Sequence, residues 1–197
     1  MISFYINGEP VEVQLEGEET IGDVLRSFEI TCEQNHAATI GITVDGKAVT
    51  AKEFDSVAEQ PLAKDTKFEF SVVTAQDVKQ SFAALSQLFA NLSQMMEQIP
   101  ASIQSGNNAE VTQAINKVAD SIDQFSYIAS LAGLFPQDFE NILIDDMNFK
   151  NFFAEFNNVL SDFEQAFKNN DTVLIGDLSE YEICPRLKAI SESLAKI

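Results

Sequence analysis

The sequence predicts an α+β protein in which a small mixed domain precedes an antiparallel bundle of four helices. Two observations carry this prediction. Apolar residues alternate with polar residues as far as about residue 74, and beyond it they recur every three or four residues. Asn7-Gly8 and Asp45-Gly46 interrupt the first region, and such pairs are typical of two-residue turns between antiparallel strands. We therefore expect one domain over residues 1–74 and the helical bundle over residues 75–197.

The N-terminal domain is expected to begin with a hairpin and a helix. Residues 2–6 and 11–15 alternate in hydrophobicity on either side of the Asn-Gly pair. A helix should follow from Thr20, because Thr20 and Asp23 have the spacing of a capping box. Its apolar residues share one helical face: Ile21, Val24, Leu25 and Phe28.

Three further strands complete the predicted domain. Residues 40–44 should form a strand that turns at Asp45-Gly46 into a short strand at 48–49. A helical turn is expected over 54–58, and the last strand over 67–73. Thr74 and Asp77 again have capping-box spacing, so the first bundle helix should follow the last strand without a flexible linker.

This order of hairpin, helix, strand, short strand and strand resembles the β-grasp, or ubiquitin-like, fold. Three segments carry the resemblance, and together they lie within about 74 residues: INGEPVEV, TIGDVLRSF and ITVDGKAV. Family members that act as modifiers or sulfur carriers use a free C-terminal Gly-Gly tail. Here the last strand leads into a helix, so the resemblance implies a docking module without that chemistry.

Four long helices with short connections predict the bundle. Heptad-like apolar stripes cover residues 78–99, 111–132 and 149–167, and a final helix begins near Asp171. Pro100 should disturb the first helix, and a short linking helix is expected around 139–143. The stretch VLIGDLSEYEICPRL also resembles uncharacterised helical domains of bacterial proteins, which implies no activity.

The final helix is expected to contain a structural joint made by Asp171, Tyr181 and Pro185. Asp171 is placed as an N-cap. Leu174, Leu178, Tyr181 and Pro185 share one apolar face, and the face that begins at Ile183 lies roughly opposite. Proline lacks the backbone N–H that a helix interior needs. We therefore predict a kink or break between Ile183 and Arg186, with the two halves packed against different neighbours.

Charge narrows the classes of partner. The formal net charge is −19, and both regions are acidic. Lys and Arg do not cluster, so nucleic acid and anionic membrane surfaces are not expected as partners. A protein partner is expected, and a second copy of the chain stays open as that partner. The longest apolar run is too short to cross a bilayer, and the N-terminus lacks the pattern of a signal peptide, so the expected location is the cytoplasm.

No catalytic, cofactor-binding or metal-ligating residue is predicted, and we expect no enzyme. His36 is the single histidine, and Cys32 and Cys184 lack a C-x-x-C spacing or basic neighbours. Asp145-Asp146 begins like a calcium loop, but the positions that should follow hold unsuitable residues. The acidic pair is therefore interpreted as an N-cap of the third long helix.

Four apolar residues beside the heptad stripes form a candidate partner or ligand surface: Leu88, Met95, Phe152 and Val159. A wide core face is the structural interpretation of these residues. The functional interpretations are a groove for a partner helix and a cavity for an apolar ligand. The expected function is accordingly a non-enzymatic, acidic protein-interaction module of adaptor or chaperone-like type. The alternative is an apolar-ligand-binding protein with a cavity in the Phe-rich bundle.

Overall fold

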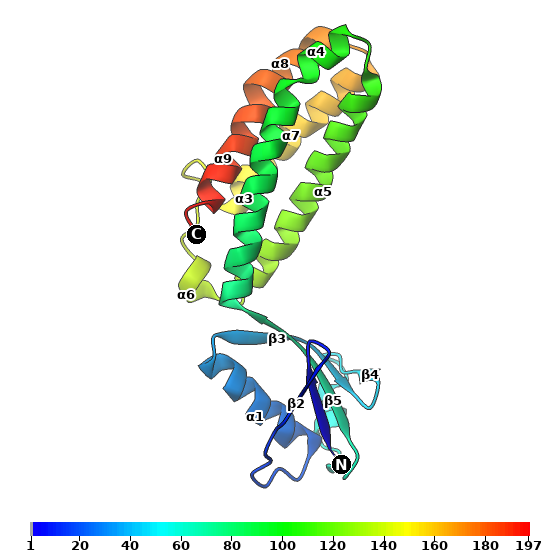
Figure 1. Cartoon of the computed structure of the whole chain (residues 1–197), viewed down its shortest axis with the longest axis vertical. Coiled ribbons are helices and arrows are strands. Elements are labelled where there is room, and N and C mark those ends of the chain that lie inside the picture. The colour runs from blue at the N-terminus through cyan, green and yellow to red at the C-terminus, as the bar shows by residue number, and fades with distance from the viewer. Residues whose placement is uncertain (1) are drawn as a thin grey trace. The chain divides into compact units, whose positions relative to one another are not determined.

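A five-stranded sheet forms the N-terminal part of the chain, and the rest is mostly helical (Figure 1). The computed structural model describes residues 2–197. The chain divides into two compact units, one ending at Asp77 and the other beginning at Val78. Each unit is described by itself below.

The sheet has the strand order β2-β1-β5-β3-β4. Its strands are β1 Ser3–Ile6, β2 Glu9–Val11, β3 Ala37–Val44, β4 Lys47–Ala48 and β5 Lys67–Thr74. β1 and β5 are parallel, and the other neighbours are antiparallel. β2 ends at Val11, although the alternation predicted a strand as far as residue 15. Val11 already pairs with Phe4 near the start of β1, so the residues beyond it have little strand left to pair with.

Both predicted hairpin turns are confirmed, and each also binds the central strand. Asn7, Gly8, Asp45 and Gly46 all have positive φ angles, as a two-residue turn of this kind requires. The Asn7 side-chain oxygen accepts the Val72 N–H at 2.8 Å, and the Asn7 side-chain nitrogen donates to the Val72 carbonyl at 3.0 Å. The Asp45 carboxylate accepts the Lys67 N–H at 2.8 Å. The turn residues therefore hold β5 between the two hairpins.

The core of this unit lies between the sheet and α1, Ile21–Gln34. Its buried members are Phe4, Ile21, Val24, Leu25, Val44, Phe68 and Phe70. Phe28 of α1 stacks on Phe70 of β5 with a ring-centroid distance of 3.7 Å. A short helix, α2 Phe54–Ala58, confirms the predicted helical turn and packs beside α1.

The capping box predicted at the start of α1 is confirmed. The Thr20 hydroxyl oxygen accepts the Asp23 N–H at 3.1 Å, and the Asp23 carboxylate accepts the Thr20 N–H at 3.0 Å. Hydrogen bonds from Thr20 and from Arg26 lower the pKa of Asp23 from 3.8 to about 2. The ionised carboxylate is thus favoured by the folded state.

We expect Asp23→Asn to be less stable than the wild type at pH 7, with a difference that shrinks in acid. The folded-state pKa is depressed, so the stabilisation from Asp23 is fully present above about pH 4. It is lost as the pH falls from 3.8 to about 2. Urea unfolding followed by circular dichroism at pH 7 and near pH 2 measures this change. Asp55→Asn, in α2, is the control, and an unchanging difference between Asp23→Asn and wild type contradicts the prediction.

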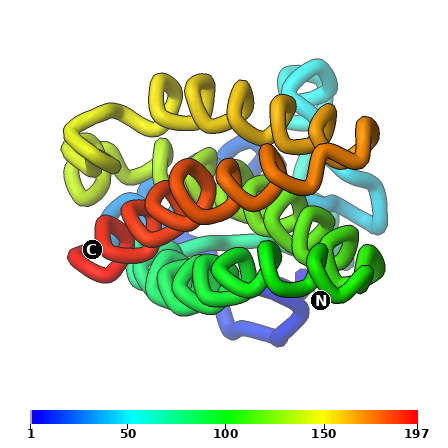
Figure 2. Tube along the Cα trace, turned by 90° about the horizontal axis from the view of Figure 1, so that it is seen from above, coloured from blue at the N-terminus to red at the C-terminus, as the bar shows by residue number. Residues whose placement is uncertain are grey.

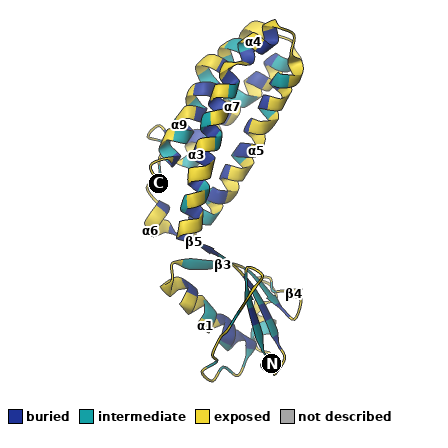
Figure 3. Ribbon diagram, viewed as in Figure 1, coloured by how far each residue is buried: buried dark blue, intermediate teal, exposed yellow. Residues whose placement is uncertain are grey.

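The helical unit contains one π-helical segment among its α-helices. Its elements are α3 Ala75–Glu97, α4 Ile99–Gln104, α5 Asn108–Ala132, α6 Pro136–Phe139, α7 Phe149–Lys168, α8 Thr172–Asp177, the π-helix η1 Leu178–Ile183 and α9 Cys184–Leu194. The disturbance predicted at Pro100 is confirmed, because α3 ends before it and Pro100 lies in the first turn of α4. Figure 3 shows that each long helix alternates buried and exposed residues along its length.

Phenylalanine rings and hydroxyl groups join the long helices. Phe125 of α5 contacts Phe82 of α3 at 6.1 Å and Phe149 of α7 at 4.9 Å between ring centroids. One turn further along α3, the Ser86 hydroxyl donates to the Ser191 carbonyl of α9 at 2.8 Å. α9 accordingly runs beside α3 (Figure 2).

The interpretation of Asp145-Asp146 as an N-cap is wrong. Both residues have positive φ angles and form a tight turn in which Ile144 and Met147 exchange backbone hydrogen bonds of 2.9 Å. The N-cap of α7 is Asn148, whose side-chain oxygen accepts the Asn151 N–H at 2.9 Å. The linking helix also lies earlier than predicted, because Pro136 begins it rather than preceding it.

The predicted apolar face of Leu174, Leu178, Tyr181 and Pro185 is wrong, although helical geometry does change near Pro185. Leu174 is 42% exposed and Tyr181 is 65% exposed. The regular α-helix stops at Asp177, η1 follows, and Pro185 lies in the first turn of α9, directly after η1. The geometry therefore changes twice, after Asp177 and again after Ile183, and both changes precede Pro185.

The spacing of the buried residues explains the π-helix. Ile175, Ser179, Ile183 and Leu187 are buried and lie four residues apart. In an α-helix each step of four overshoots a turn by about 40°, so three steps carry a side chain about 120° around the axis. A π-helix holds more residues per turn, because its hydrogen bonds reach five residues back, as from the Cys184 N–H to the Ser179 carbonyl. The π geometry keeps these side chains on one face.

Two glycines lie where helices contact each other, and replacing each with alanine should have opposite effects on stability. A Cβ atom at Gly22 of α1 would lie 2.8 Å from the Ala58 Cβ and 2.9 Å from its carbonyl oxygen. Gly22→Ala should therefore destabilise the chain by about 1–3 kcal/mol. At Gly176 of α8 the nearest atom would be the Pro100 Cβ at 3.8 Å, so Gly176→Ala should stabilise by about 0.5–1 kcal/mol. Urea unfolding measures both, and the same sign for the two variants contradicts the geometry.

Candidate functional site

Two adjoining pockets form a groove between α4 and the C-terminal helices, within the helical unit. One has a volume of about 740 Å³ and the other about 440 Å³. Pro100, Gln104 and Glu180 line both pockets, so the two are continuous. Figure 1 shows α4 and α8 close together at one end of the helical unit, where the groove lies. We call these two pockets together the Cys184 groove, and its lining includes Ser93, Glu97, Pro100, Gln104, Val173, Asp177, Glu180, Cys184, Pro185 and Lys188.

A reciprocal hydrogen-bonded pair forms the floor of the groove. The Ser93 hydroxyl donates to the Cys184 carbonyl at 3.1 Å, and the Cys184 thiol donates to the Ser93 carbonyl at 3.4 Å. These bonds fasten α9 to α3. Burial, with the nearby charges of Glu97 and Glu180, raises the pKa of Cys184 to about 11. The thiol is therefore protonated at neutral pH and is not a nucleophile.

The rim of the groove is acidic. Glu97, Asp177 and Glu180 are exposed, and none of them takes part in an ion pair among residues 2–197. The charge of Glu180 and a hydrogen bond to its carboxylate raise the pKa of Tyr181, and burial and the charge of Asp177 contribute less. Lys188 is the lysine at this rim, and it pairs with Glu192 at 3.8 Å. The groove thus carries a net negative charge, three acids against one lysine, around a floor whose polar groups bond each other.

The four apolar residues that the sequence singled out do not line this groove. Phe152 is 2% exposed and packs against Phe153 and Phe156 in the core, so it does not lie on a surface. Leu88, Met95 and Val159 are half-buried. Asp171 caps α8 by accepting the Leu174 N–H at 3.0 Å. Tyr181 is exposed beside the groove residue Glu180, and Pro185 lines the groove itself.

Sequence reasoning missed the groove because its two walls are about 80 residues apart in the chain. Pro100 and Pro185 each mark an interrupted helix in the sequence, and the structure brings these two interruptions to the same pocket. The acids of the stretch from Asp171 to Glu182 were a visible signal. Nothing local indicated which of them would face α4.

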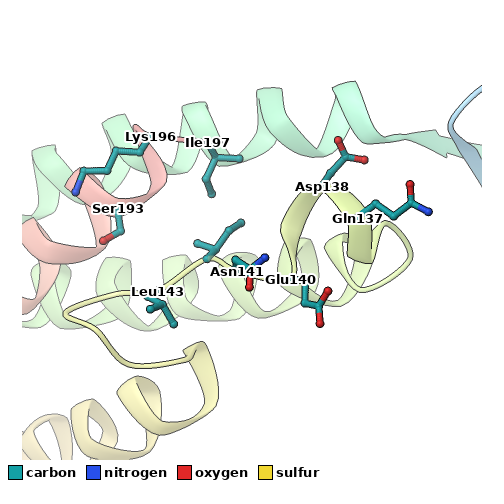
Figure 4. Close-up of a pocket in the computed structure, with 9 residues that line it drawn as sticks. Gln137, Asp138, Glu140, Asn141, Leu143, Ser193, Lys196 and Ile197 are labelled. Atoms are coloured by element: carbon teal, nitrogen blue, oxygen red, sulfur yellow. The ribbon is translucent and has the colours of Figure 1, made fainter.

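Apart from the Cys184 groove, a pocket of about 410 Å³ lies where α6 and the following loop meet the end of α9. Figure 4 shows that the carboxylates of Asp138 and Glu140 point in different directions there. Another pocket, of about 460 Å³, lies between α1 and residues 11–16 of the sheet unit. There the Glu18 carboxylate already accepts the Ser27 hydroxyl at 2.9 Å and the Glu16 N–H at 2.7 Å. Neither pocket gathers polar groups onto a common point.

Within residues 2–197, no three His, Cys, Asp or Glu side chains come together as a metal-binding group. His36 is exposed, with a φ angle of 51°, in the turn after α1. Cys32 is buried, and burial raises the pKa of its thiol. In the same part of the chain, no helix combines the length and apolar composition needed to cross a bilayer.

The chain belongs to the family of the domain of unknown function DUF8042, whose model matches residues 80–193. Residues 2–74 match a second model, described as the TP0873 N-terminal domain. An uncharacterized protein of Treponema pallidum (strain Nichols) is 24% identical over 189 residues, which cover 96% of this chain and 94% of that protein. No solved structure matches the chain. The similarity to the relative thus extends over both units.

Proposed function

We propose that the chain is a non-enzymatic protein-interaction module, of adaptor or chaperone-like type, and that the Cys184 groove is its docking site. The observation that carries the proposal is an open groove, with Pro100 and the mutually bonded Ser93 and Cys184 in its lining, flanked by three acids that take part in no ion pair of residues 2–197. π-helical segments frequently occur at functional sites, and η1 supplies Glu180 to this groove. The location we propose is the cytoplasm.

For the N-terminal unit we propose a β-grasp, ubiquitin-like domain. The order of its strands, the parallel β1–β5 pair at the centre and the single helix α1 packed on one face support this assignment. The outer face of β5 carries Lys67 and Glu69, which pair at 2.7 Å, and the Lys67 ammonium lies over the Tyr5 ring. That face is polar, which favours docking elsewhere on the chain.

For residues 75–197 we propose a four-helix antiparallel bundle, and we place the domain boundary between residues 74 and 75. The four members are α3, α5, α7 and the continuous run of α8, η1 and α9. Ring contacts link α3 to α5 and α5 to α7, and hydroxyl hydrogen bonds link α3 to α9. α7 packs against α8 and η1, so each of the four members contacts two others.

The competing function, storage of an apolar ligand among the phenylalanines, has less support. The rings of Phe82, Phe125 and Phe149 fill the space between their helices, with centroid distances from 4.9 to 6.4 Å. The three pockets described above in the helical unit have no phenylalanine in their walls. Mass spectrometry of the protein purified under native conditions tests for a retained apolar molecule.

Site-specific crosslinking tests the docking proposal. A photoreactive benzophenone residue at Gln104, which is exposed and lines both pockets, should crosslink a partner in cells of the source organism. The same residue at Glu155, exposed on α7, is the control. An adduct specific to position 104 supports the proposal. Equal labelling from both positions, or no protein adduct from either, argues against it.

A further inference from the structure

We infer that the Cys184 groove binds a basic segment of a partner protein, with lysine or arginine side chains on either side of one or two large apolar side chains. This inference rests on the proposed docking function and specifies the chemistry of the partner. It combines three properties of the groove: its charge, its floor and its extent.

Charge selects a cationic occupant. Glu97 reaches the groove from the end of α3, and Asp177 and Glu180 reach it from α8 and η1. The acids therefore flank the floor from both sides, and none of them takes part in an ion pair of residues 2–197. Lys188, which also lines the groove, pairs with Glu192, so the groove keeps a net negative charge. Cationic side chains from a partner would meet a carboxylate on each wall, and complementary charge of this kind increases both association rate and specificity.

The floor selects apolar side chains between those charges. It contains the protonated thiol of Cys184 and the ring of Pro100, and Pro185 continues it at one end. At the other end Val173 lines the groove and is 71% exposed. An apolar side chain placed here would cover surface that water now contacts.

The extent of the groove favours a segment of a protein chain over a small molecule. Two joined pockets, with most of their lining residues exposed, offer an open trough in place of an enclosed cavity. Small molecules are usually bound in sites that bury most of their surface. A second copy of this chain is disfavoured, because it would bring a further net charge of −19 to an acidic rim.

Fluorescence anisotropy with designed peptides tests the inference. The probe is a labelled amphipathic peptide of about 14 residues built from leucine and lysine, the length of a short recognition helix. Two comparison peptides replace lysine with glutamate or leucine with serine. The leucine–lysine peptide should bind with at least about tenfold higher affinity than either.

Charge-reversed variants distinguish the effect of the groove's carboxylates on peptide binding from the effect of the net charge of the chain. Glu97→Lys/Glu180→Lys should weaken binding of the leucine–lysine peptide on the order of tenfold. The matched control is Glu155→Lys/Asp162→Lys on α7, which changes the net charge by the same amount and should weaken binding less than about threefold. Glu97→Gln/Glu180→Gln gives the same comparison with a smaller perturbation if the reversed variant does not fold.

Each outcome decides between the groove and another explanation. Equal weakening by the two reversed variants means that the peptide responds to net charge, and the inference is wrong. If the glutamate peptide binds as tightly as the leucine–lysine peptide, the groove does not select cationic side chains, and the inference is again wrong. If crosslinking at Gln104 captures a partner but no basic peptide binds, the docking function stands and the inference about the partner's chemistry fails. If position 104 also captures nothing, the docking function itself fails.

Discussion

Replacing Phe82 with alanine is expected to lower the free energy of unfolding of the helical unit by about 3–5 kcal/mol. Phe82 is fully buried near the start of α3, and its ring meets Phe125, Phe139 and Phe149 at centroid distances of 6.1, 5.8 and 6.4 Å. These neighbours belong to three different elements, α5, α6 and α7. A cavity bounded by three separate elements collapses poorly, so the loss of apolar contact should persist in the variant.

Urea unfolding of the variant, followed by far-ultraviolet circular dichroism, measures the effect. Phe54→Ala in α2 is the matched control, because Phe54 is 37% exposed and the same truncation there should cost less than about 1 kcal/mol. Phe82→Leu should fall between the two. A loss below about 1 kcal/mol for Phe82→Ala would mean that the ring does not organise this core.

Sequence periodicity predicted the environment of Phe82 because the stripe on α3 is narrow. All seven apolar residues of that stripe are buried: Val78, Phe82, Leu85, Phe89, Leu92, Met96 and Ile99. On α7 the predicted stripe covers only part of the core face. Phe156 and Phe163 of the predicted stripe are buried, but Phe149, Phe153 and Phe167 are only half-buried, and Phe152 is buried beside them. Phenylalanine occurs on both sides of that stripe, so spacing alone does not determine which ring faces the core.

The candidate site was less predictable than the elements that build it. The capping boxes and the turns are local patterns, and they were visible in the sequence. The groove depends on Pro100 and Pro185 reaching the same place from distant segments. The position of Glu180 on the groove wall also depends on the π geometry of η1. A uniform step of about 100° per residue, as in an α-helix, wrongly assigned the buried face of that helix to Leu174 and Tyr181.

Deleting Tyr181 is expected to destabilise the chain by about 3 kcal/mol, through Pro185 and not through lost packing. Tyr181 is 65% exposed, so its removal takes nothing from the core. Removing one residue from η1 would change the spacing of the buried residues Ile175, Ser179, Ile183, Leu187, Ile190 and Leu194 to the alternating four and three of a continuous α-helix. In that helix Pro185 becomes an interior residue, where its ring meets the preceding turn and a carbonyl loses its donor.

The double variant separates this cause from others. Pro185→Ala alone should change stability by less than about 1 kcal/mol, because Pro185 is exposed and lies in the first turn of α9, where its ring is accommodated after η1. Adding Pro185→Ala to the deletion should restore most of the lost stability, since nothing then opposes the continuous α-helix. Urea unfolding of the four proteins gives the coupling energy between the two changes. Additive effects, with the double variant at least as unstable as the deletion, would show that η1 is held by contacts other than the proline that follows it.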